Sequence, residues 1–298
     1  MSAVTPFKPY ESHLLRPGNT NCAGCGMSIG LQWLDEALGD EKPVLAIPSC
    51  CGIVTAGAFP TRGYGVPTAA TTFASSPAVA TGISAVSAMN GIDNPVICWA
   101  GDGGTYDIGL ATLSAAAERN EDIIYICYDN EIYGNTGGQR SGATPVGAVT
   151  STTPTGKGER KKDIMAIMAS HRIPYAATLS IGHREDFLSK VRKARSMKGF
   201  RFLLMLSPCP TGWKSEPDQS TELIELAVRS GLFPLYEVFD GRRYRINLRP
   251  DSTSIEPYIK QQRRFRKVWN DTDALQAFID AQWQYLDGMA TVFPAKED

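Results

Sequence analysis

Polar residues able to bind a metal follow two apolar runs in the middle of the 298-residue chain. Asp102 lies in a Gly-Asp-Gly-Gly turn after the first run, and Asn130 lies 28 positions later in an Asp-Asn-Glu turn after the second. This spacing fits one strand-helix-strand unit, so both turns are expected at the same edge of a parallel sheet. A carboxylate and an amide oxygen at that edge suit Mg²⁺, and the glycines let a diphosphate approach the backbone closely.

The cysteines form a second group of residues that could bind a metal or take part in redox chemistry. Five of the seven lie in Gly- or Pro-bounded turns at the ends of expected elements: Cys22, Cys25, Cys50, Cys51 and Cys209. Four thiolates from three separate loops would form a tetrahedral sulfur site for either Zn²⁺ or an iron-sulfur cluster. The bare Cys-x-x-Cys pair is also typical of a redox dithiol, and spacing leaves these chemistries open. Cys98 and Cys127 lie inside apolar runs, and we interpret them as small buried hydrophobes.

Alternating strand and helix patterns surround these turns and predict an α/β fold with a doubly wound, mainly parallel sheet. Strands are expected at residues 43–47, 96–99, 123–128, 175–179 and 202–206, and helices at 27–38, 78–89, 108–119, 163–170, 185–196 and 220–230. Residues 55–76 and 129–160 are predicted to be loops. The second loop contains seven glycines, and a loop of that length inside a compact domain is usually functional.

The part of the chain beyond residue 230 has a different pattern. A hairpin is expected over residues 235–248, turning at Asp240-Gly241, followed by a final helix over 273–286. We interpret this part as a small C-terminal appendage. The predicted organisation is a cofactor-binding α/β domain at residues 1–230, extended by a hairpin and helices at residues 231–298.

Composition and charge limit the partners and the location of the protein. The apolar content of 43% allows a sizeable core, and the net charge of −1 gives no reason to expect nucleic acid or a membrane surface. The apolar runs are strand-sized, and the N-terminus lacks the design of a secretory signal. We expect a cytoplasmic protein whose cysteines are ligands or buried thiols rather than disulfides.

The pair of turns resembles the thiamine diphosphate signature, in which Asp-Gly is followed by Asn at this spacing. The resemblance implies that Asp102 and Asn130 bind Mg²⁺ through their side-chain oxygens and Ile132 through its main-chain carbonyl. The residues expected around the cofactor are Gly101, Asp102, Gly103, Gly104, Asn130, Ile132, Gly134 and Asn135. Asn135 is the candidate catalytic residue, because its amide could hydrogen-bond to the substrate or to the diphosphate.

Longer motifs are similar to the β subunits of the 2-oxoacid:ferredoxin oxidoreductases, in the pyruvate synthase branch, over nearly the whole chain. The matching stretches are CAGCG at 22–26, SCC at 49–51, GDGG at 101–104, YDNE at 128–131, NTGGQRSGATP at 135–145 and SPCPTGW at 207–213. This resemblance implies a [4Fe-4S] cluster held by Cys22, Cys25, Cys209 and one of Cys50 or Cys51. We favour Cys51, because family members have Gly-Cys here and Cys50 then replaces the glycine.

The same resemblance implies the reaction and the partners. A small 2-oxoacid, with pyruvate as the first candidate, would be decarboxylated oxidatively to acetyl-CoA and CO₂, with electrons passed singly to the cluster and on to ferredoxin. In the family, the carboxylate that activates thiamine comes from the α subunit. We therefore expect this chain to be inactive alone and to work in a hetero-oligomer with α and γ/δ-type subunits.

Two departures from the pyruvate branch concern the substrate. Phe73 is followed by Ala74-Ser75-Ser76 where an acidic residue is usual, and Met27 stands where glutamate is frequent. A site with fewer acidic groups suits a more anionic 2-oxoacid such as oxalate, which would give CO₂ without coenzyme A. Ordinary sequence drift explains the same differences, so oxalate is the alternative substrate.

Alternatives of other classes make different predictions. A non-oxidative thiamine-dependent lyase or synthase subunit would have the Mg²⁺ site but no cluster. A zinc-stabilised or electron-transfer subunit would have a metal but no thiamine. Arg140 could face a substrate carboxylate, coenzyme A, solvent or a partner. The basic segment at residues 263–267 is expected to be a solvated or subunit-facing helix end.

Overall fold

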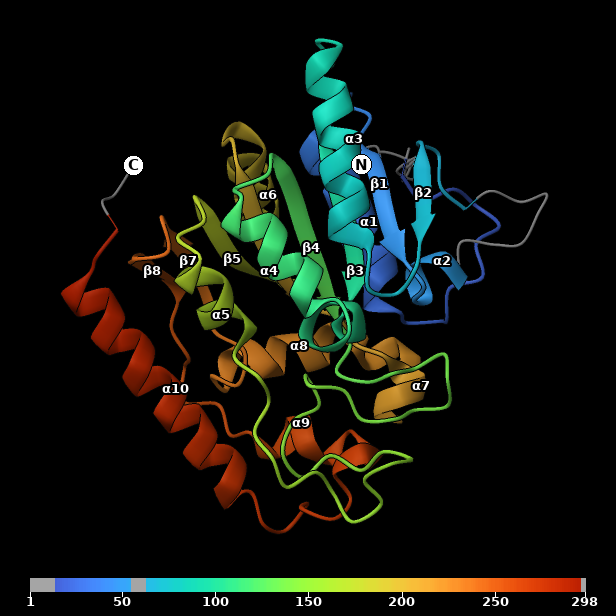
Figure 1. The fold of residues 1–298 in the computed structure, drawn as a ribbon. Helices are drawn as coiled ribbons and strands as arrows, with labels where there is room; N and C mark the ends of the chain where they lie inside the picture. Colours follow the sequence, from blue (N-terminus) through green and yellow to red (C-terminus); the bar gives the residue numbers. More distant parts are fainter. Residues whose placement is uncertain (1–13, 55–62, 296–298) are drawn as a thin grey trace, which may run out of the picture.

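The computed structural model describes residues 14–54 and 63–295. Within these ranges one eight-stranded sheet has the order β2-β1-β3-β4-β6-β5-β7-β8 (Figure 1). The strands, in chain order, are β1 Val44–Pro48, β2 Thr68–Thr71, β3 Val96–Gly101, β4 Ile123–Asp129, β5 Tyr175–Ser180, β6 Phe200–Leu206, β7 Leu235–Phe239 and β8 Arg243–Leu248.

The first six strands are parallel, and the last two are antiparallel to their neighbours. Every residue of β3, β4 and β6 is buried. Their sequences are nearly continuous apolar runs, as expected for parallel strands that are covered on both faces. The doubly wound, mainly parallel fold predicted from the alternation of elements is confirmed.

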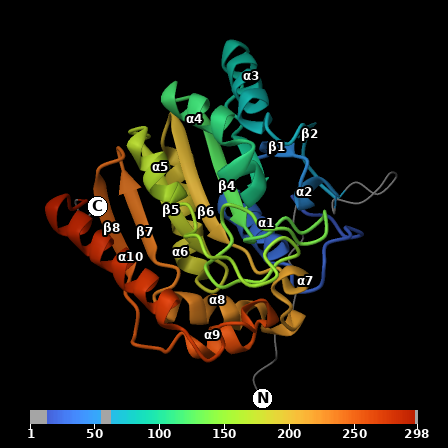
Figure 2. The same ribbon diagram turned by 60° about the horizontal axis from the view of Figure 1, so that its bottom comes forward.

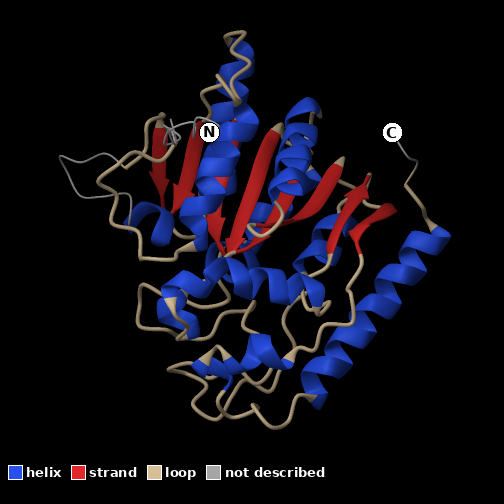
Figure 3. Ribbon diagram, turned by 180° about the vertical axis from the view of Figure 1, so that it is seen from behind, coloured by secondary structure: helices blue, strands red, loops and turns tan. Residues whose placement is uncertain are grey.

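The helices form two layers on the sheet and a third group at its carboxyl edge. In chain order they are α1 Gly26–Leu38, α2 Cys51–Val54, α3 Ser76–Met89, α4 Leu110–Glu118, α5 Ile164–Ser170, α6 Arg184–Ser196, α7 Pro210–Trp213, α8 Ser220–Arg229, α9 Glu256–Lys260 and α10 Asp273–Val292. Helices α3, α4 and α5 cover one face, and α1 and α6 cover the other (Figures 1 and 3). In the described ranges no helix combines the length and apolarity needed to span a membrane.

The carboxyl edge of the parallel strands carries most of the irregular chain. The loop between β4 and α5 lies there together with α7, α8 and α9 (Figure 2). The structure places no helix or strand in the loop at residues 130–163, in agreement with the predicted loop at 129–160. Segments from the middle and from the C-terminal part of the chain therefore meet at one edge of the sheet.

Two local features differ from the sequence-based expectations. The predicted loop at 55–76 contains β2, a four-residue edge strand that pairs with β1; its residues 55–62 lie outside the described ranges. Strand β2 is short and made of Thr and Ala, so it lacks an apolar alternation. The helix predicted from Ile108 begins at Leu110, and a π-helical turn at Gly103–Asp107 precedes it. Such turns are frequent at functional sites.

The C-terminal part continues the sheet. Strand β7 pairs with β5 across the predicted boundary at residue 230, and β8 pairs with β7. The turn between them uses positive φ angles at both central residues, 52° at Asp240 and 61° at Gly241. Helix α10 then packs along β8 (Figure 1). The division into residues 1–230 and 231–298 stays a prediction, because the sheet itself is continuous.

Gly241 is expected to be essential for this hairpin. A Cβ atom there would lie 2.1 Å from the main-chain oxygen of Ala169. We predict that Gly241→Ala lowers the free energy of unfolding by roughly 3 kcal/mol, because backbone strain adds to a main-chain clash. Gly91 has a φ of +66° but open space around it, so Gly91→Ala should cost only about 1 kcal/mol. Urea unfolding of both variants measures the difference, and equal losses would contradict the packing argument.

Candidate functional site

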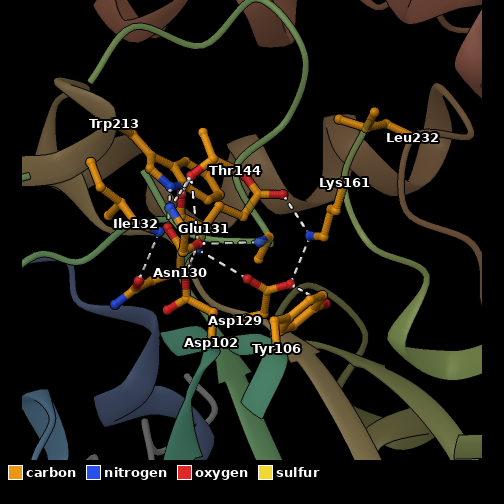
Figure 4. A network of polar contacts seen from close by, with 12 residues as sticks. Asp102, Tyr106, Asp129, Asn130, Glu131, Ile132, Thr144, Lys161, Trp213 and Leu232 are labelled. Atoms are coloured by element: carbon orange, nitrogen blue, oxygen red, sulfur yellow. Dashed lines mark hydrogen bonds and ion pairs between the residues drawn. The ribbon is translucent and has the colours of Figure 1, made fainter. Parts of the chain in front are cut away.

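The two turns predicted to carry chemistry lie side by side at the carboxyl ends of β3 and β4. These strands pair in parallel, with Gly101 at the end of β3 opposite Tyr128 in β4. Asp102 follows β3 directly, and Asn130 follows β4. Both side chains therefore lie at the same edge of the sheet, as their spacing predicts (Figure 4).

The side chains of Asp102 and Asn130 meet the main-chain oxygen of Ile132. One end of the Asn130 amide lies 2.7 Å from Ile132 O and 3.1 Å from Asp102 Oδ1. With its nitrogen at that end, the amide donates a hydrogen bond to each oxygen. With its oxygen there, that oxygen has each of the other two at about 3 Å, the separation of neighbouring ligands around six-coordinate Mg²⁺. The donor atoms and their spacing fit a divalent cation.

Asp102 holds its carboxylate in a nearly dry environment. The residue is 3% exposed, and Ser141 Oγ donates a hydrogen bond to Oδ2. Burial, and then the Asp129 carboxylate, raise the pKa of Asp102 well above its ordinary value, although the bond from Ser141 acts in the opposite direction. A buried carboxylate is costly unless a cation or several donors balance it. A cation bound at Asp102 would remove this cost.

A buried group of charges lies beneath Asn130. Its neighbours Asp129 and Glu131 share the ammonium of Lys161, whose Nζ lies 2.7 Å from Asp129 Oδ2 and 2.9 Å from Glu131 Oε1 (Figure 4). Tyr106 OH also donates to Asp129 Oδ2 at 2.7 Å. Burial lowers the pKa of Lys161, but the two carboxylates outweigh it and hold that pKa above its ordinary value. These contacts fix the main chain on both sides of Asn130.

Arg264 reaches the same turn from the C-terminal part of the chain. The prediction of a solvated or subunit-facing segment at 263–267 is wrong for this residue, which is 2% exposed. Its Nη2 lies 2.7 Å from Glu131 Oε2, and its guanidinium lies 4.0 Å from the ring centre of Trp213. Trp213 Nε1 in turn donates to the main-chain oxygen of Asn130 at 2.8 Å. The positive charge of Arg264 therefore pairs with the Glu131 carboxylate inside the site.

Close packing against aromatic side chains requires a glycine at position 103 of the Gly-Asp-Gly-Gly turn. A Cβ atom on Gly103 would lie 2.2 Å from Cε1 of Tyr133 and 2.8 Å from Cζ of Phe73. Gly104 is also buried, with Phe73 and Pro48 at ordinary contact distance from a Cβ. The Gly-Asp-Gly-Gly turn therefore lets the main chain after β3 come close to aromatic side chains.

A cavity of about 560 Å³ lies beside the turn that follows β4 and is lined by Asn130 and Ile132. Its walls include four of the turn cysteines, Cys22, Cys25, Cys51 and Cys209. Burial, and then the neighbouring thiols with Cys209 first, raise the pKa of Cys51 to about 12. Cys50 does not line this cavity, and its Sγ accepts a hydrogen bond from Tyr128 OH at 2.7 Å. Of these two neighbouring cysteines, therefore, Cys51 lines the cavity and Cys50 does not.

The same cavity reaches four of the eight residues expected around the cofactor, and Gly101, Asp102, Gly103 and Gly104 are not among its lining residues. It is lined by Asn130, Ile132, Gly134 and Asn135, and the side chains of Lys214 and Arg266 add positive charge. No Asp or Glu from the described ranges lines it. Within residues 14–54 and 63–295, no three His, Cys, Asp or Glu side chains form a group that could hold one metal ion. The metal ligands named from the sequence therefore stay predictions.

Arg140 is not among the residues that line this cavity. The residue is exposed, and its Nη1 lies 3.9 Å from Glu159 Oε2, which is itself exposed. Exposed ion pairs contribute little to stability. The structure gives Arg140 no contact with the candidate site among the described residues.

Known proteins match almost the whole chain. Residues 49–205 match the family model of the thiamine pyrophosphate enzyme, C-terminal TPP binding domain. A ketoisovalerate oxidoreductase subunit VorB of Pyrococcus horikoshii is 42% identical over 302 residues, which cover 96% of each chain. A pyruvate synthase subunit PorB of Methanothermobacter marburgensis is 42% identical over 288 residues, or 94% of this chain and 99% of the relative. The chain belongs to the β subunits of the 2-oxoacid:ferredoxin oxidoreductases.

A solved structure shows the same fold. A 2-oxoglutarate:ferredoxin oxidoreductase from Magnetococcus marinus superimposes with a TM-score of 0.58 and 23% identity, covering 71% of this chain and 79% of that one. The family resemblance drawn from the motifs is confirmed, and the β subunit is an enzyme subunit with a thiamine pyrophosphate-binding domain. The matched range holds Asp102, Asn130 and Cys51, whereas Cys22, Cys25 and Cys209 lie outside it.

Several residues of the site were not identified from the sequence of the β subunit. Ser141 lies in the motif at 135–145, and its hydroxyl could have been proposed as a partner for a carboxylate. Lys161 is one of three consecutive basic residues that otherwise suggest a solvated stretch. Arg264 lies 133 positions after its partner Glu131, and no periodicity joins them. Only the folded chain brings these three side chains to the turns.

Two carboxylates near the turns should affect stability with opposite signs. The pKa of Asp102 is raised by burial and then by Asp129, so its charge opposes folding above the ordinary Asp pKa. Burial also raises the pKa of Asp107, but bonds from Lys162, Gly142 and Tyr133 outweigh it and lower that pKa. The charge of Asp107 therefore stabilises the fold above the ordinary Asp pKa, and this is lost as pH falls through the folded pKa.

We predict that Asp102→Asn stabilises the metal-free β subunit at neutral pH by about 1 kcal/mol, or about 2–4 °C in Tm. Asp107→Asn should destabilise it by about 1 kcal/mol, after a discount for partial exposure. The Asp102 difference should shrink as pH falls from neutral toward about 4, and the Asp107 difference should shrink as pH falls below about 4. Thermal unfolding with chelator at several pH values measures them. A loss of stability in Asp102→Asn at neutral pH would contradict the assignment of a balancing cation to this position.

Proposed function

We propose that this chain is the thiamine diphosphate- and [4Fe-4S]-containing β subunit of a pyruvate:ferredoxin oxidoreductase, which converts pyruvate and coenzyme A to acetyl-CoA and CO₂ and passes electrons to ferredoxin. The observation that supports this most is the single cavity lined by Asn130 and Ile132 as well as by the four turn cysteines. A thiamine site and a cluster site next to each other suit electron transfer between the two groups.

In this proposal Mg²⁺ is held by Asp102, Asn130 and Ile132, whose oxygens have the separations described above. The diphosphate lies against the main chain of the glycine turn at Gly101, Gly103 and Gly104 and against Gly134, which lines the cavity, and Asn135 donates to the diphosphate or the substrate. Lys214 and Arg266 give the cavity the positive charge that an anionic cofactor and substrate require. When bound, the thiazolium supplies an electron sink for decarboxylation and the cluster accepts single electrons.

The charges around the turns support a cation at Asp102. Three buried carboxylates lie here, Asp102, Asp129 and Glu131, and two cations, Lys161 and Arg264, balance two of them. One carboxylate charge is left over, and Lys161 and Arg264 both contact the Asp129–Glu131 side. A divalent cation at Asp102 would offset the remaining negative charge and leave one positive charge for the anionic diphosphate.

The four cluster ligands in this proposal are Cys22, Cys25, Cys51 and Cys209. They come from three separate turns, and all of them face the cavity. Cys50 does not line the cavity and accepts a hydrogen bond from Tyr128, and it is therefore the poorer candidate. Thiolate ligands must be deprotonated, and the raised pKa of Cys51 means that the cluster has to stabilise the thiolate at this position.

Partner subunits complete the site. No Asp or Glu in the described ranges lines the cavity, although thiamine activation needs a carboxylate near the aminopyrimidine. Relatives that are 42% identical to this chain are named as subunits of pyruvate synthase and ketoisovalerate oxidoreductase. We propose that an α subunit supplies this carboxylate, with further γ/δ-type subunits and ferredoxin as electron acceptor.

The second candidate substrate is ketoisovalerate. The relatives named for ketoisovalerate and for pyruvate share the same 42% identity with this chain. Met27 stands where glutamate is frequent in the pyruvate branch, and its side chain adds apolar surface to the cavity. An apolar wall suits a branched 2-oxoacid better than the dianion oxalate, so oxalate becomes a third choice.

The cofactors are tested by chemical analysis of the complex purified without oxygen. We predict thiamine and about four iron and four sulfide per β subunit. Cys51→Ser should lose most of the iron and the broad visible absorption of the cluster, whereas the matched variant Cys50→Ser should keep both. Zinc in place of iron, or equal iron loss in the two variants, would refute the cluster assignment; iron without thiamine would refute the thiamine site.

The substrate is tested with the assembled complex and a panel of pyruvate, ketoisovalerate, oxalate and 2-oxoglutarate, each with and without coenzyme A. We predict the highest kcat/KM for pyruvate, about tenfold or more above ketoisovalerate, because additional methyl groups change pocket binding by factors of this size. The β subunit alone should show no turnover with an artificial electron acceptor. Turnover of oxalate without coenzyme A, or activity of the single chain, would overturn the corresponding assignment.

A further inference from the structure

Arg264 occupies an unusual place for a residue of the C-terminal part. It follows α9 on a short 3₁₀ turn at Arg263–Phe265, and it points into the cluster of charges below the metal-binding turn. Besides Glu131, it contacts Tyr258 OH at 3.0 Å through Nη2 and Gln262 Oε1 at 2.8 Å through Nε. Its guanidinium is therefore held on several sides within the protein.

We propose that Arg264 is a positioning residue for the Mg²⁺ turn, acting through Glu131. This inference rests on the proposed function, because it assigns a role toward the cation that Asp102, Asn130 and Ile132 would hold. Glu131 lies between two of those three ligands. Whatever fixes the main chain at Glu131 also fixes the direction of Asn130 and of the Ile132 carbonyl.

The backbone at Glu131 needs such support. Its φ is +64°, in the left-handed region that non-glycine residues rarely adopt. The peptide is held by two main-chain contacts, Glu131 N to Asp129 Oδ1 at 3.0 Å and Thr144 Oγ1 to Glu131 O at 2.7 Å. Strained conformations of this kind persist only where surrounding contacts determine them. The carboxylate of Glu131 provides the remaining contacts.

The two oxygens of that carboxylate have different partners. Oε1 pairs with Lys161, which also serves Asp129, whereas Oε2 pairs with Arg264. Lys161 alone would have to balance two buried carboxylates without Arg264. Removal of one partner from a buried pair is strongly destabilising because it leaves a charge without compensation. Glu131 would then turn away from its present position, and its neighbours would move with it.

Arg264 reaches the turn by a second route. Its guanidinium covers the ring of Trp213, and Trp213 Nε1 donates to the main-chain oxygen of Asn130. A planar guanidinium can pair with Oε2 and stack on the indole at once, which a lysine ammonium cannot do. Arg264 therefore touches Glu131 directly and Asn130 through one intermediate side chain, and lysine should be a poor substitute.

The test is a Mn²⁺ titration of the assembled, cofactor-stripped complex with saturating thiamine diphosphate, followed by electron paramagnetic resonance. Mn²⁺ is an oxygen-preferring probe for the Mg²⁺ site, and its binding is read without turnover. We predict that Arg264→Met raises the dissociation constant for Mn²⁺ at least tenfold and that Arg264→Lys lies between it and the wild type. The matched control Arg263→Met, an exposed neighbour, should keep the wild-type value. Activity assays should show a raised Mg²⁺ requirement with kcat restored at high Mg²⁺.

A double variant separates positioning from general packing. If Arg264 acts through Glu131, Arg264→Met should cost threefold or less in the Glu131→Gln background. An undiminished tenfold loss there, or equal constants for Arg264→Met and Arg263→Met, would overturn the inference. Should Arg264→Met not fold, a wild-type constant for Arg264→Lys would overturn it as well. A wild-type complex that binds no Mn²⁺ with thiamine diphosphate would instead refute the proposed function.

Discussion

The ion pairing of buried carboxylates at the ends of β3 and β4 is the constraint on which the site depends. Neighbouring parallel strands bring their carboxyl ends together, so the acidic residues that follow them are forced into one small, dry space. Like charges at such distances are costly unless cations balance them. Lys161 and Arg264 provide part of that balance, and the excess of one carboxylate makes the position of Asp102 suited to a divalent cation.

This charge balance also explains why distant segments of the chain meet at one edge of the sheet. The glycine-rich loop contributes Ser141 and Lys161, and the segment after α9 contributes Arg264. The hairpin β7–β8 extends the sheet on the way to this segment. The C-terminal part therefore contributes to the site of the parallel domain, because its Arg264 balances one of the carboxylates at the strand ends.

The cavity next to these charges joins two kinds of chemistry in one space. Oxygen and amide groups from the turns form one side, and four thiols from three loops form another. The absence of acidic groups from its lining in the described ranges separates it from the carboxylate cluster below. That separation places the negative charges where they can hold a cation and leaves the positive charges of Lys214 and Arg266 for anionic ligands. A missing carboxylate fits a family whose members are named as subunits.

The sequence by itself determined the parts that depend on local pattern and on short motifs. Apolar runs predicted the buried strands, the two turns predicted neighbouring strand ends, and the cysteine motifs predicted which thiols lie near each other. The structure also shows that Cys51, which the family resemblance favours, lines the cavity and that Cys50 does not. The tertiary structure alone decided two further points: that Thr68–Thr71 adds an edge strand and that Arg264 is buried against Glu131. Each depends on contacts between residues far apart in the chain, and hydrophobic periodicity reports only on near neighbours along it.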